Sequence, residues 1–320
     1  MLELRRTTVT AADGPWCETE LGRAWSDPAL HPPPAPGDEV VVNVQARELG
    51  LGSGGYDVVV ANLTRGLEHT PLGEAHVMKL NYTPLQHAVQ PADGSIAAAR
   101  AAGTPVAVFP LHGHLPALAW GLQQAAPGTR LGYVQTAGGA LPGRLSNAVA
   151  ELRERGWLDH HVTAGPAYGG EHEAITTAGA ICSAIEAGCD AVVCGPGPGI
   201  LGSGTELGHG GMVALDSAHA ALALGLPTLL VARLSGADPR ERHRGISHHT
   251  RTVLELLLAP VTVALPRGEQ PADDRHDWRT ADGSLDGFPW PLRTMGREDP
   301  RFFAAAAAAG RTLAAMITRL

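Results

Sequence analysis

The segment 236–252 carries the densest set of chemically active side chains in the sequence. It contains four arginines, three histidines and one aspartate, namely Arg240, Arg242, Arg244, Arg251, His243, His248, His249 and Asp238. It directly follows the apolar, strand-like run 228–232. Guanidinium groups bind carboxylates and phosphates, and imidazoles exchange protons near neutral pH. The segment therefore predicts a site that holds an anion or moves protons.

A glycine-rich segment at 195–211 has the composition of an anion cradle. Glycines let backbone N–H groups point inward toward a phosphate or carboxylate, and hydroxyl side chains add further donors. We expect the ligand to contact Gly197, Gly199, Gly202, Ser203, Gly204 and Thr205. The segment is not a Walker loop, because no Gly-Lys-Ser/Thr ends it, and it is not a dinucleotide-binding fingerprint.

These two segments give a first hypothesis about binding. We expect Arg242 and Arg244 to clamp an anionic group of the substrate. His243 and Thr136 are further candidate ligand-binding residues. Tight turns and surface ion pairs are the alternative interpretation of the same residues.

Proton transfer in this hypothesis falls to His248 or His249. Only one of two adjacent imidazoles at the start of a helix can face inward, so the two are not equivalent. Asp238 or Glu171 would orient the active imidazole. Glu171 alternatively supplies only a favourable charge at the start of a helix predicted over 171–187.

Two further features widen the set of candidates. His112 and His114 have the spacing at which two imidazoles reach one divalent metal ion if the chain stays extended. Lys79 is the only lysine in the chain, and a compact ammonium fits pockets that a guanidinium does not. We expect Lys79 to complete the positive charge of the site. Apart from a possible divalent metal, no cofactor is predicted.

The elements that position these residues indicate an α/β fold. Residues 1–88 form a β-rich, barrel-like module, with strands expected at 38–44, 56–62 and 76–82 and a hairpin turn within 49–55. Residues 89–266 alternate apolar strands with helices, which is typical of a mainly parallel, Rossmann-like three-layer sheet. Residues 267–298 are expected to run over the surface. Asp299 and Pro300 then begin a last docking helix, with Asp299 as its N-cap.

The alternating part predicts specific elements. Strands are expected at 105–109, 130–135, 161–163, 190–194, 228–232 and 261–265, and helices near 116–124, 146–155, 171–187, 212–224 and 247–258. The loops that follow the strands are rich in Gly, His or Arg, whereas the turns that lead into the strands are plain. Because ligands bind at the carboxyl ends of parallel strands, we expect the chemistry at that one edge.

Composition excludes several classes of protein. The net charge of −8 argues against nonspecific nucleic-acid binding, and no window is apolar enough for a membrane span. No secretory signal is visible, and the four cysteines show neither a disulfide framework nor a zinc spacing. We therefore expect a cytoplasmic protein that binds a small anionic metabolite, without nucleic-acid or membrane partners. The apolar last helix makes a homodimer possible.

Five ordered motifs carry a resemblance to a known family. They are MKLNYTPLQ (78–86), ALPGRLS (140–146), YGGEHEAI (168–175), GPGPGILGSGTELGHGG (195–211) and HRGISHHT (243–250). With them the chain resembles the bacterial family of domain of unknown function 3866, over roughly residues 1–266. The resemblance implies a common fold and a shared site, but no activity. In that family an acidic residue often follows the threonine of the second loop, where this chain has Ala137.

Three functions remain open at this stage. The leading one is a hydrolase or group transferase acting on a small anionic or phosphorylated metabolite. The second is a non-catalytic metabolite sensor or partner protein that uses the same pocket. The third is a metal-dependent hydrolase built on His112, His114, Glu171 and His248.

Overall fold

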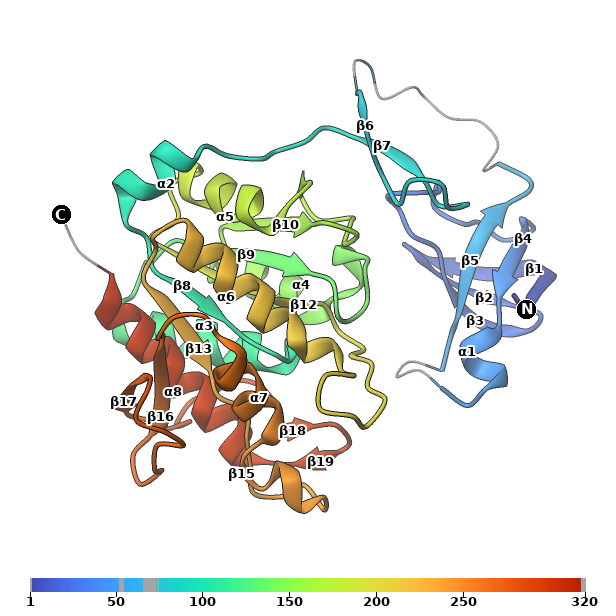
Figure 1. Ribbon diagram of the computed structural model, residues 1–320. Coiled ribbons are helices and arrows are strands. Elements are labelled where there is room, and N and C mark those ends of the chain that lie inside the picture. The colour runs from blue at the N-terminus through green and yellow to red at the C-terminus, as the bar shows by residue number, and fades with distance from the viewer. Residues whose placement is uncertain (1, 52–54, 66–72, 74, 318–320) are drawn as a thin grey trace. The chain divides into compact units, whose positions relative to one another are not determined.

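The chain divides into two compact units, Met1–Val89 and Gln90–Leu320, which are described separately (Figure 1). The computed structural model describes residues 2–51, 55–65, 73 and 75–317. None of the helices within these ranges is long and apolar enough to cross a bilayer.

The first unit is built around a closed five-stranded barrel with the order β1-β2-β3-β5-β4. Its strands are β1 (Leu4–Asp13), β2 (Trp16–Thr19), β3 (Gly22–Trp25), β4 (Glu39–Asn43) and β5 (Asp57–Asn62). Inward valines such as Val9, Val40, Val42 and Val59 form its core. A short helix, α1 (Gln45–Glu48), follows β4, and the separate hairpin β6 (Val77–Lys79) and β7 (His87–Val89) ends the unit.

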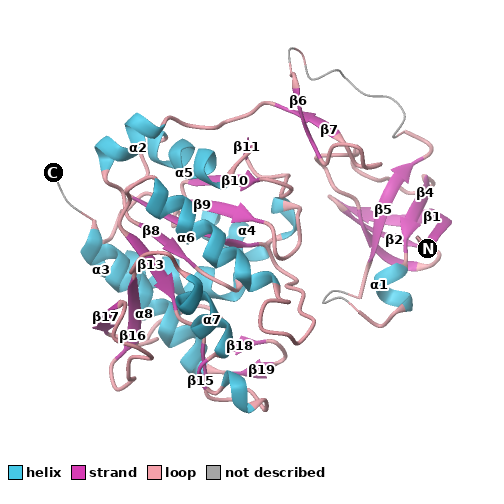
Figure 2. Ribbon diagram, in the orientation of Figure 1, coloured by secondary structure: helices cyan, strands magenta, loops and turns pink. Residues whose placement is uncertain are grey.

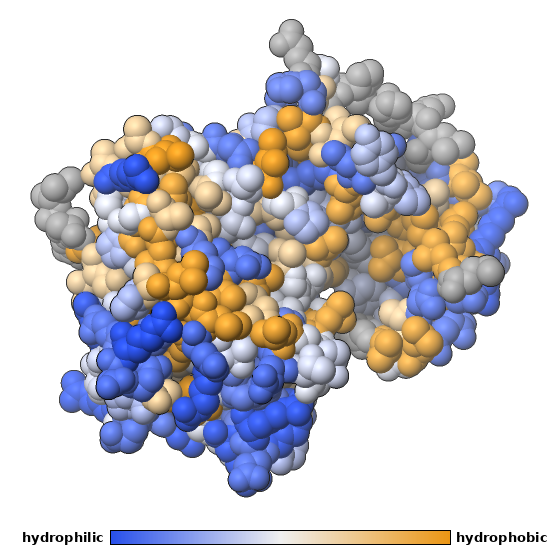
Figure 3. Space-filling model, in the orientation of Figure 1, coloured by the Kyte–Doolittle hydropathy of each residue, from blue (hydrophilic) through white to orange (hydrophobic). Residues whose placement is uncertain are grey.

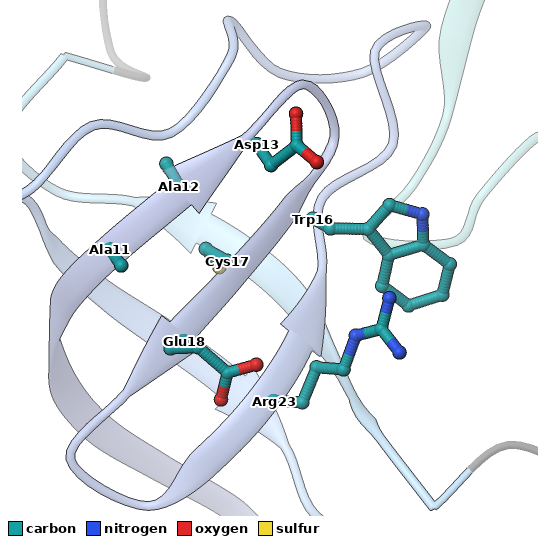
Figure 4. A pocket seen from close by; sticks show the side chains of 7 residues that line it. All are labelled: Ala11, Ala12, Asp13, Trp16, Cys17, Glu18 and Arg23. Atoms are coloured by element: carbon teal, nitrogen blue, oxygen red, sulfur yellow. The ribbon is translucent and has the colours of Figure 1, made fainter.

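The barrel confirms the β-rich first module, with β4 and β5 at the predicted strands. Residues 52–54 of the predicted hairpin turn lie outside the described residues. The wall of the barrel holds a pocket of about 240 Å³, in which the guanidinium of Arg23 lies over the Trp16 ring, 4.3 Å from its centroid (Figure 4). Asp13 and Glu18 also line this pocket.

The second unit contains an eight-stranded sheet in which every neighbouring pair is parallel. The order is β11-β10-β9-β12-β8-β13-β16-β17. The strands are β8 (Val106–Val108), β9 (Leu131–Thr136), β10 (His160–Ala164), β11 (His172–Ala174), β12 (Ala191–Pro196), β13 (Thr228–Val231), β16 (Thr262–Pro266) and β17 (Asp277–Ala281). The central strands are buried on both faces, as their continuous apolar runs predict.

Helices cover both faces of this sheet and make three layers (Figure 2). One face packs on α3 (Leu115–Ala125), α4 (Asn147–Glu154) and α8 (Pro300–Met316). The other face packs on α2 (Ile96–Ala102), α5 (Thr177–Glu186), α6 (Val213–Ala223) and α7 (His248–Leu256). Alternate residues of β8 and of the position after it show the division, because Val106 and Val108 join one core while Ala107 and Phe109 join the other.

The single helix predicted over 171–187 is wrong. Residues 172–174 form β11, and α5 begins only after Thr176, whose side chain accepts a hydrogen bond from the Gly179 amide. This N-cap fixes the start of the helix and leaves Glu171 in the loop before a strand.

The surface excursion predicted at 267–298 is also partly wrong. Residues 277–281 form β17 and extend the sheet at its edge, where exposed side chains hide the strand from an apolar pattern. A small hairpin, β18 (Arg293–Thr294) and β19 (Arg297–Glu298), precedes α8. Asp299 occupies the N-cap position of α8 without capping it. Its carboxylate instead accepts hydrogen bonds from the Ser235 hydroxyl and the Gly236 amide.

Candidate functional site

The arginine- and histidine-rich segment folds back on itself after β13. The short strands β14 (Leu234–Ser235) and β15 (Gly245–Ile246) pair antiparallel, with the 3₁₀ turn η4 (Glu241–His243) between them. Ser247 then caps α7 by accepting a hydrogen bond from the amide of His249. This hairpin brings the imidazole of η4 against the first turn of α7.

Three imidazoles converge as a result. The rings of His243, His248 and His249 have centroids 4.2–4.8 Å apart. One nitrogen from each can be chosen so that all three lie within 4.8 Å of one another. A fourth ring, His209 from the glycine-rich loop, stacks on His249 with centroids 3.4 Å apart and planes 14° apart. We call these four residues the histidine cluster.

The environment keeps the histidine cluster uncharged. Burial is the main cause of their lowered pKa values, and neighbouring charged groups lower these values further. The pKa of His243 is lowered to about 3, that of His249 to about 2 and that of His209 to about 4. The pKa of His248 is lowered as well. At neutral pH the rings are therefore neutral, which is the form that donates a lone pair to a metal ion.

Three of the four imidazoles carry a buried nitrogen without a hydrogen-bond partner among the described residues, since both nitrogens of His209 share this property with one nitrogen each of His243 and His248. His243 is fully buried and shares a hydrogen bond of 2.8 Å between its Nδ1 and the Ser247 hydroxyl. Its Nε2, and the Nε2 of His248, are buried and make no hydrogen bond within the described part of the chain. A buried polar atom without a partner costs free energy, so a ligand that occupies these nitrogens would be stabilising.

His249 is held differently. Arg233, only 2% exposed, donates a hydrogen bond of 3.0 Å from Nη1 to Nδ1 of His249. Because a guanidinium only donates, this bond places the proton of neutral His249 on Nε2. His249 can therefore bind a metal ion only where Arg233 releases it.

Asp238 makes no hydrogen bond to a histidine among the described residues. It is fully buried and accepts hydrogen bonds from Arg233 (3.2 Å), Arg240 (3.0 Å) and Arg297 (2.5 Å). Burial alone would raise its pKa, but its bonds and charge contacts with these arginines hold the pKa well below the usual range. The carboxylate of Asp238 is therefore the anion that this arginine group already binds, and its role in orienting a histidine stays a prediction.

The predicted arginine clamp is open to solvent. Arg242 and Arg244 are exposed, and Arg244 donates from Nε to the backbone oxygen of Asp238 at 3.2 Å. A Cβ built on Gly204 would lie 4.0 Å from Nη2 of Arg242, so this guanidinium faces the glycine-rich loop. Hydrophilic side chains gather on this part of the surface, around α7 and the hairpin β18–β19 (Figure 3).

Glycine is required in this loop for different reasons at different positions. Gly197 is required by packing, because a Cβ there would lie 2.3 Å from the Ala140 carbonyl oxygen. Gly199 and Gly204 adopt positive φ angles of 72° and 86°. At the exposed tip, the hydroxyls of Ser203 and Thr205 hydrogen-bond each other at 3.1 Å. They are accessible donors, but not free ones.

The loop nevertheless reaches the histidine cluster. Gly202 forms an isolated antiparallel bridge with His209. This bridge places the His209 ring on His249, although β8 lies between β12 and β13 in the sheet. The sequence alone does not single out His209, since nothing local indicates that its partner lies forty residues later.

The two candidate metal-binding histidines of the first loop make other contacts within the described residues. Residues 112–114 form a 3₁₀ turn, η1 (His112–His114), rather than the extended chain that the prediction requires. His112 uses Nδ1 toward the Pro196 carbonyl oxygen at 3.1 Å and Nε2 toward the Ser146 hydroxyl at 2.7 Å. His114 is fully buried and stacks on Phe302.

The remaining candidates are not members of the histidine cluster and have the following surroundings. Glu171 forms an ion pair with Arg153. Thr136 is buried at the end of β9, and its hydroxyl donates to the adjacent Ala137 carbonyl oxygen at 3.3 Å. Lys79 lies in β6 of the first unit, where it is buried, and its role in the site stays a prediction.

Comparison with known proteins defines the family but no activity. Among curated proteins nothing matches the chain, and among solved structures nothing matches it either. The family model described as "Protein of unknown function (DUF3866)" matches residues 23–310, beyond the range of the five motifs. The chain therefore belongs to the DUF3866 family, as its motifs predict.

Proposed function

We propose that this protein is a metal-dependent hydrolase or group transferase for a small anionic substrate. The observation that carries the proposal is the convergence of His243, His248 and His249, with partnerless Nε2 atoms on the first two. A zinc ion with Zn–N bonds of 2.0–2.1 Å needs nitrogens roughly 3.3 Å apart in a tetrahedron. Small side-chain rotations from the present separation of up to 4.8 Å would meet this requirement.

The residues present fit such an ion in chemistry as well as geometry. The Ser247 hydroxyl on Nδ1 of His243 fixes the ring orientation, as outer-shell partners of metal-binding histidines do. Arg233 hydrogen-bonds both His249 and Asp238. If it gives up the bond to His249 and keeps the one to Asp238, three neutral imidazoles can bind the ion. A divalent ion would supply a Lewis acid that polarises a carbonyl or phosphoryl oxygen.

The anionic part of the substrate would lie beside the ion. Arg242 is exposed and faces the tip of the glycine-rich loop, where Ser203 and Thr205 offer hydroxyl donors.

We also infer a Rossmann-like arrangement of the binding region. The loop after β8 leads to α3 on one face of the sheet and the loop after β12 leads to α6 on the other, which supports a ligand site between them.

Metal content tests the proposal directly. Chelator-treated protein is reconstituted with Zn²⁺, Mn²⁺ or Fe²⁺, desalted and analysed for metal. We expect about one equivalent in the wild type and a loss of at least tenfold in affinity in H243Q and H248Q. The matched control is H172Q, because His172 stacks on His160 and does not belong to the three-histidine group. A wild type that retains no stoichiometric metal would remove the proposal.

Turnover separates the enzyme from the sensor. Metal-loaded protein is screened against small phosphomonoesters and carboxylate esters, with and without chelator. Chelator-sensitive turnover that falls in R242Q supports the enzyme, whereas thermal stabilisation by an unchanged ligand supports the sensor. A homodimer and a cytoplasmic location stay predictions, and light scattering tests the first.

A further inference from the structure

A second feature of the carboxyl edge is independent of the histidine cluster. A cavity of about 220 Å³ lies where β9 and β10 end, and its lining includes Ser146, His161, Arg144 and Arg153. Ser146 is also the N-cap of α4, where its hydroxyl oxygen accepts a hydrogen bond from the Val149 amide at 3.1 Å. A capping serine is common, so the cap alone indicates no chemistry.

The partner of the Ser146 hydroxyl proton is what makes this serine unusual. The hydroxyl lies 2.7 Å from Nε2 of His112, and Nδ1 of the same ring lies 3.1 Å from the Pro196 carbonyl oxygen. A carbonyl oxygen only accepts, so the proton of neutral His112 sits on Nδ1. Nε2 must then accept, and the serine hydroxyl donates to it. This is the hydrogen-bonding arrangement of a serine nucleophile and its general base.

Burial and a neighbouring tyrosine hold His112 in this form. Burial lowers the pKa of His112 to about 4, so the ring is neutral at pH 7. The Tyr133 hydroxyl donates to the same Pro196 carbonyl oxygen at 3.0 Å. The Pro196 carbonyl oxygen therefore orients His112 in the way that the carboxylate orients the histidine of a Ser–His–Asp triad.

The lining of the cavity also includes a buried nitrogen atom without a hydrogen-bond partner among the described residues. His161 is 3% exposed, lines the cavity and stacks on Tyr133 with the two planes 2° apart. Its Nε2 is buried and has no hydrogen-bond partner within the residues described. This observation does not depend on Ser146 or His112, and it points to a polar group of a bound molecule.

The charge at the cavity selects the kind of molecule. Arg144 is exposed and makes no hydrogen bond or ion pair within the described ranges, so its guanidinium is available to an anion. Arg153 is occupied by Glu171 and by the Leu158 carbonyl oxygen. One available guanidinium near a candidate nucleophile fits an acyl group that carries a carboxylate.

We propose that Ser146, with His112 as general base, is the nucleophile of a second site that hydrolyses esters of small dicarboxylic acids. The Ser146 oxygen attacks the ester carbonyl carbon while its proton passes to Nε2 of His112. The bond to the alcohol breaks, and that proton leaves with the alcohol. Water then attacks the acyl-serine, its proton returns through His112 to the serine oxygen, and the acid is released.

Covalent labelling tests the nucleophile. Full-length protein is treated with phenylmethanesulfonyl fluoride and examined by intact mass and peptide mapping. We expect one adduct on Ser146, none there in S146A or S146G, and labelling slowed roughly 100-fold in H112N. S146G is included because glycine is tolerated at an N-cap, which keeps the test valid if S146A fails to fold. S183A is the matched control, since Ser183 also contacts a histidine, His160, at 3.5 Å.

Ester hydrolysis tests the substrate class. The mono-p-nitrophenyl ester of succinic acid should react at least tenfold faster than p-nitrophenyl acetate, and R144Q should abolish that preference. Chelator and H243Q should leave the reaction unchanged, which distinguishes it from the metal-dependent activity proposed above. An absence of both adduct and ester turnover, an adduct confined to another residue, or wild-type turnover in S146G would each overturn the proposal.

Discussion

His114 is a fully buried imidazole in the core between the sheet and α8. It stacks on Phe302 with centroids 4.1 Å apart. Burial, with the charge of Arg233 as a second cause, lowers its pKa from 6.5 to about 3. The unfolded chain therefore binds a proton between these two values that the folded chain does not. The stability that neutral His114 permits is complete above pH 6.5 and is lost as the pH falls toward 3.

Replacement of His114 by leucine should therefore weaken the acid sensitivity of folding. One such imidazole makes the free energy of unfolding fall by about 2 kcal/mol between pH 7 and pH 5. In H114L this part of the fall should disappear. Urea denaturation at the two pH values measures it, with the exposed His172 in H172Q as the control. An unchanged difference between pH 7 and pH 5 would show that His114 is not buried in the neutral form.

Asp238 gives a prediction about a buried charge. D238N leaves Arg233, Arg240 and Arg297 without their common carboxylate. We expect a loss of about 3–5 kcal/mol in the free energy of unfolding, since a buried guanidinium then lacks its counter-charge. The exposed pair of Arg279 and Asp277 is the control, and D277N should cost no more than about 1 kcal/mol. Equal losses in the two variants would contradict the buried network.

At the scale of elements, α3 and α8 make the most extensive helix–helix contact in the second unit. A Cβ on Gly121 would lie 2.3 Å from the Ala307 carbonyl oxygen, and one on Gly310 would lie 2.1 Å from the Leu118 carbonyl oxygen. The two helices therefore touch backbone to backbone at glycines. This contact explains why α8, expected only as a docking helix, is an integral part of one layer.

G121A tests this contact because two effects oppose each other. Helix propensity alone would make alanine stabilising by up to about 1 kcal/mol. The collision with α8 should instead destabilise by roughly 1–3 kcal/mol, since the backbones must separate. Thermal or urea unfolding decides the sign. A150G, at an exposed position of α4, calibrates the propensity effect in the same protein.

The elements that sequence reasoning recovered are those with local signals. The runs at 105–109, 190–194 and 228–232 are mostly apolar without alternation, and they form central strands of the sheet. The elements it missed lack such a signal. Strand β17 is mostly exposed, and β11 is three residues long, so only pairing with a neighbouring strand defines them.

The candidate sites also divide into features with a local sequence signal and features that depend on distant segments. His243, His248 and His249 lie within seven residues, so their concentration is visible in the sequence. The contacts of His209 with His249, and of Ser146 with His112, join different loops and depend on the strand order. The sequence also cannot reveal that Asp238 and Glu171 both form ion pairs with arginines.

At the scale of the whole molecule, the two units have separate cores. The core residues of the barrel all lie between Val9 and Val59, and those of the sheet all lie at or beyond Ala99. Because none of the described core residues is common to both, we expect residues 90–320 to fold alone. The histidine cluster lies wholly in that second unit, whereas Lys79 lies in the first.

Truncation to residues 90–320 should therefore separate metal binding from any contribution of Lys79. We expect the fragment to bind Zn²⁺ with an affinity within about threefold of the full chain, because all the ligands and Arg233 are retained. If Lys79 completes the positive charge of the substrate site, the fragment and full-length K79M should bind inorganic phosphate equally weakly. Calorimetric titration with each ion measures both. Loss of zinc binding in a folded fragment would mean that the barrel supplies part of the metal site, and unchanged phosphate binding in K79M would remove Lys79 from it.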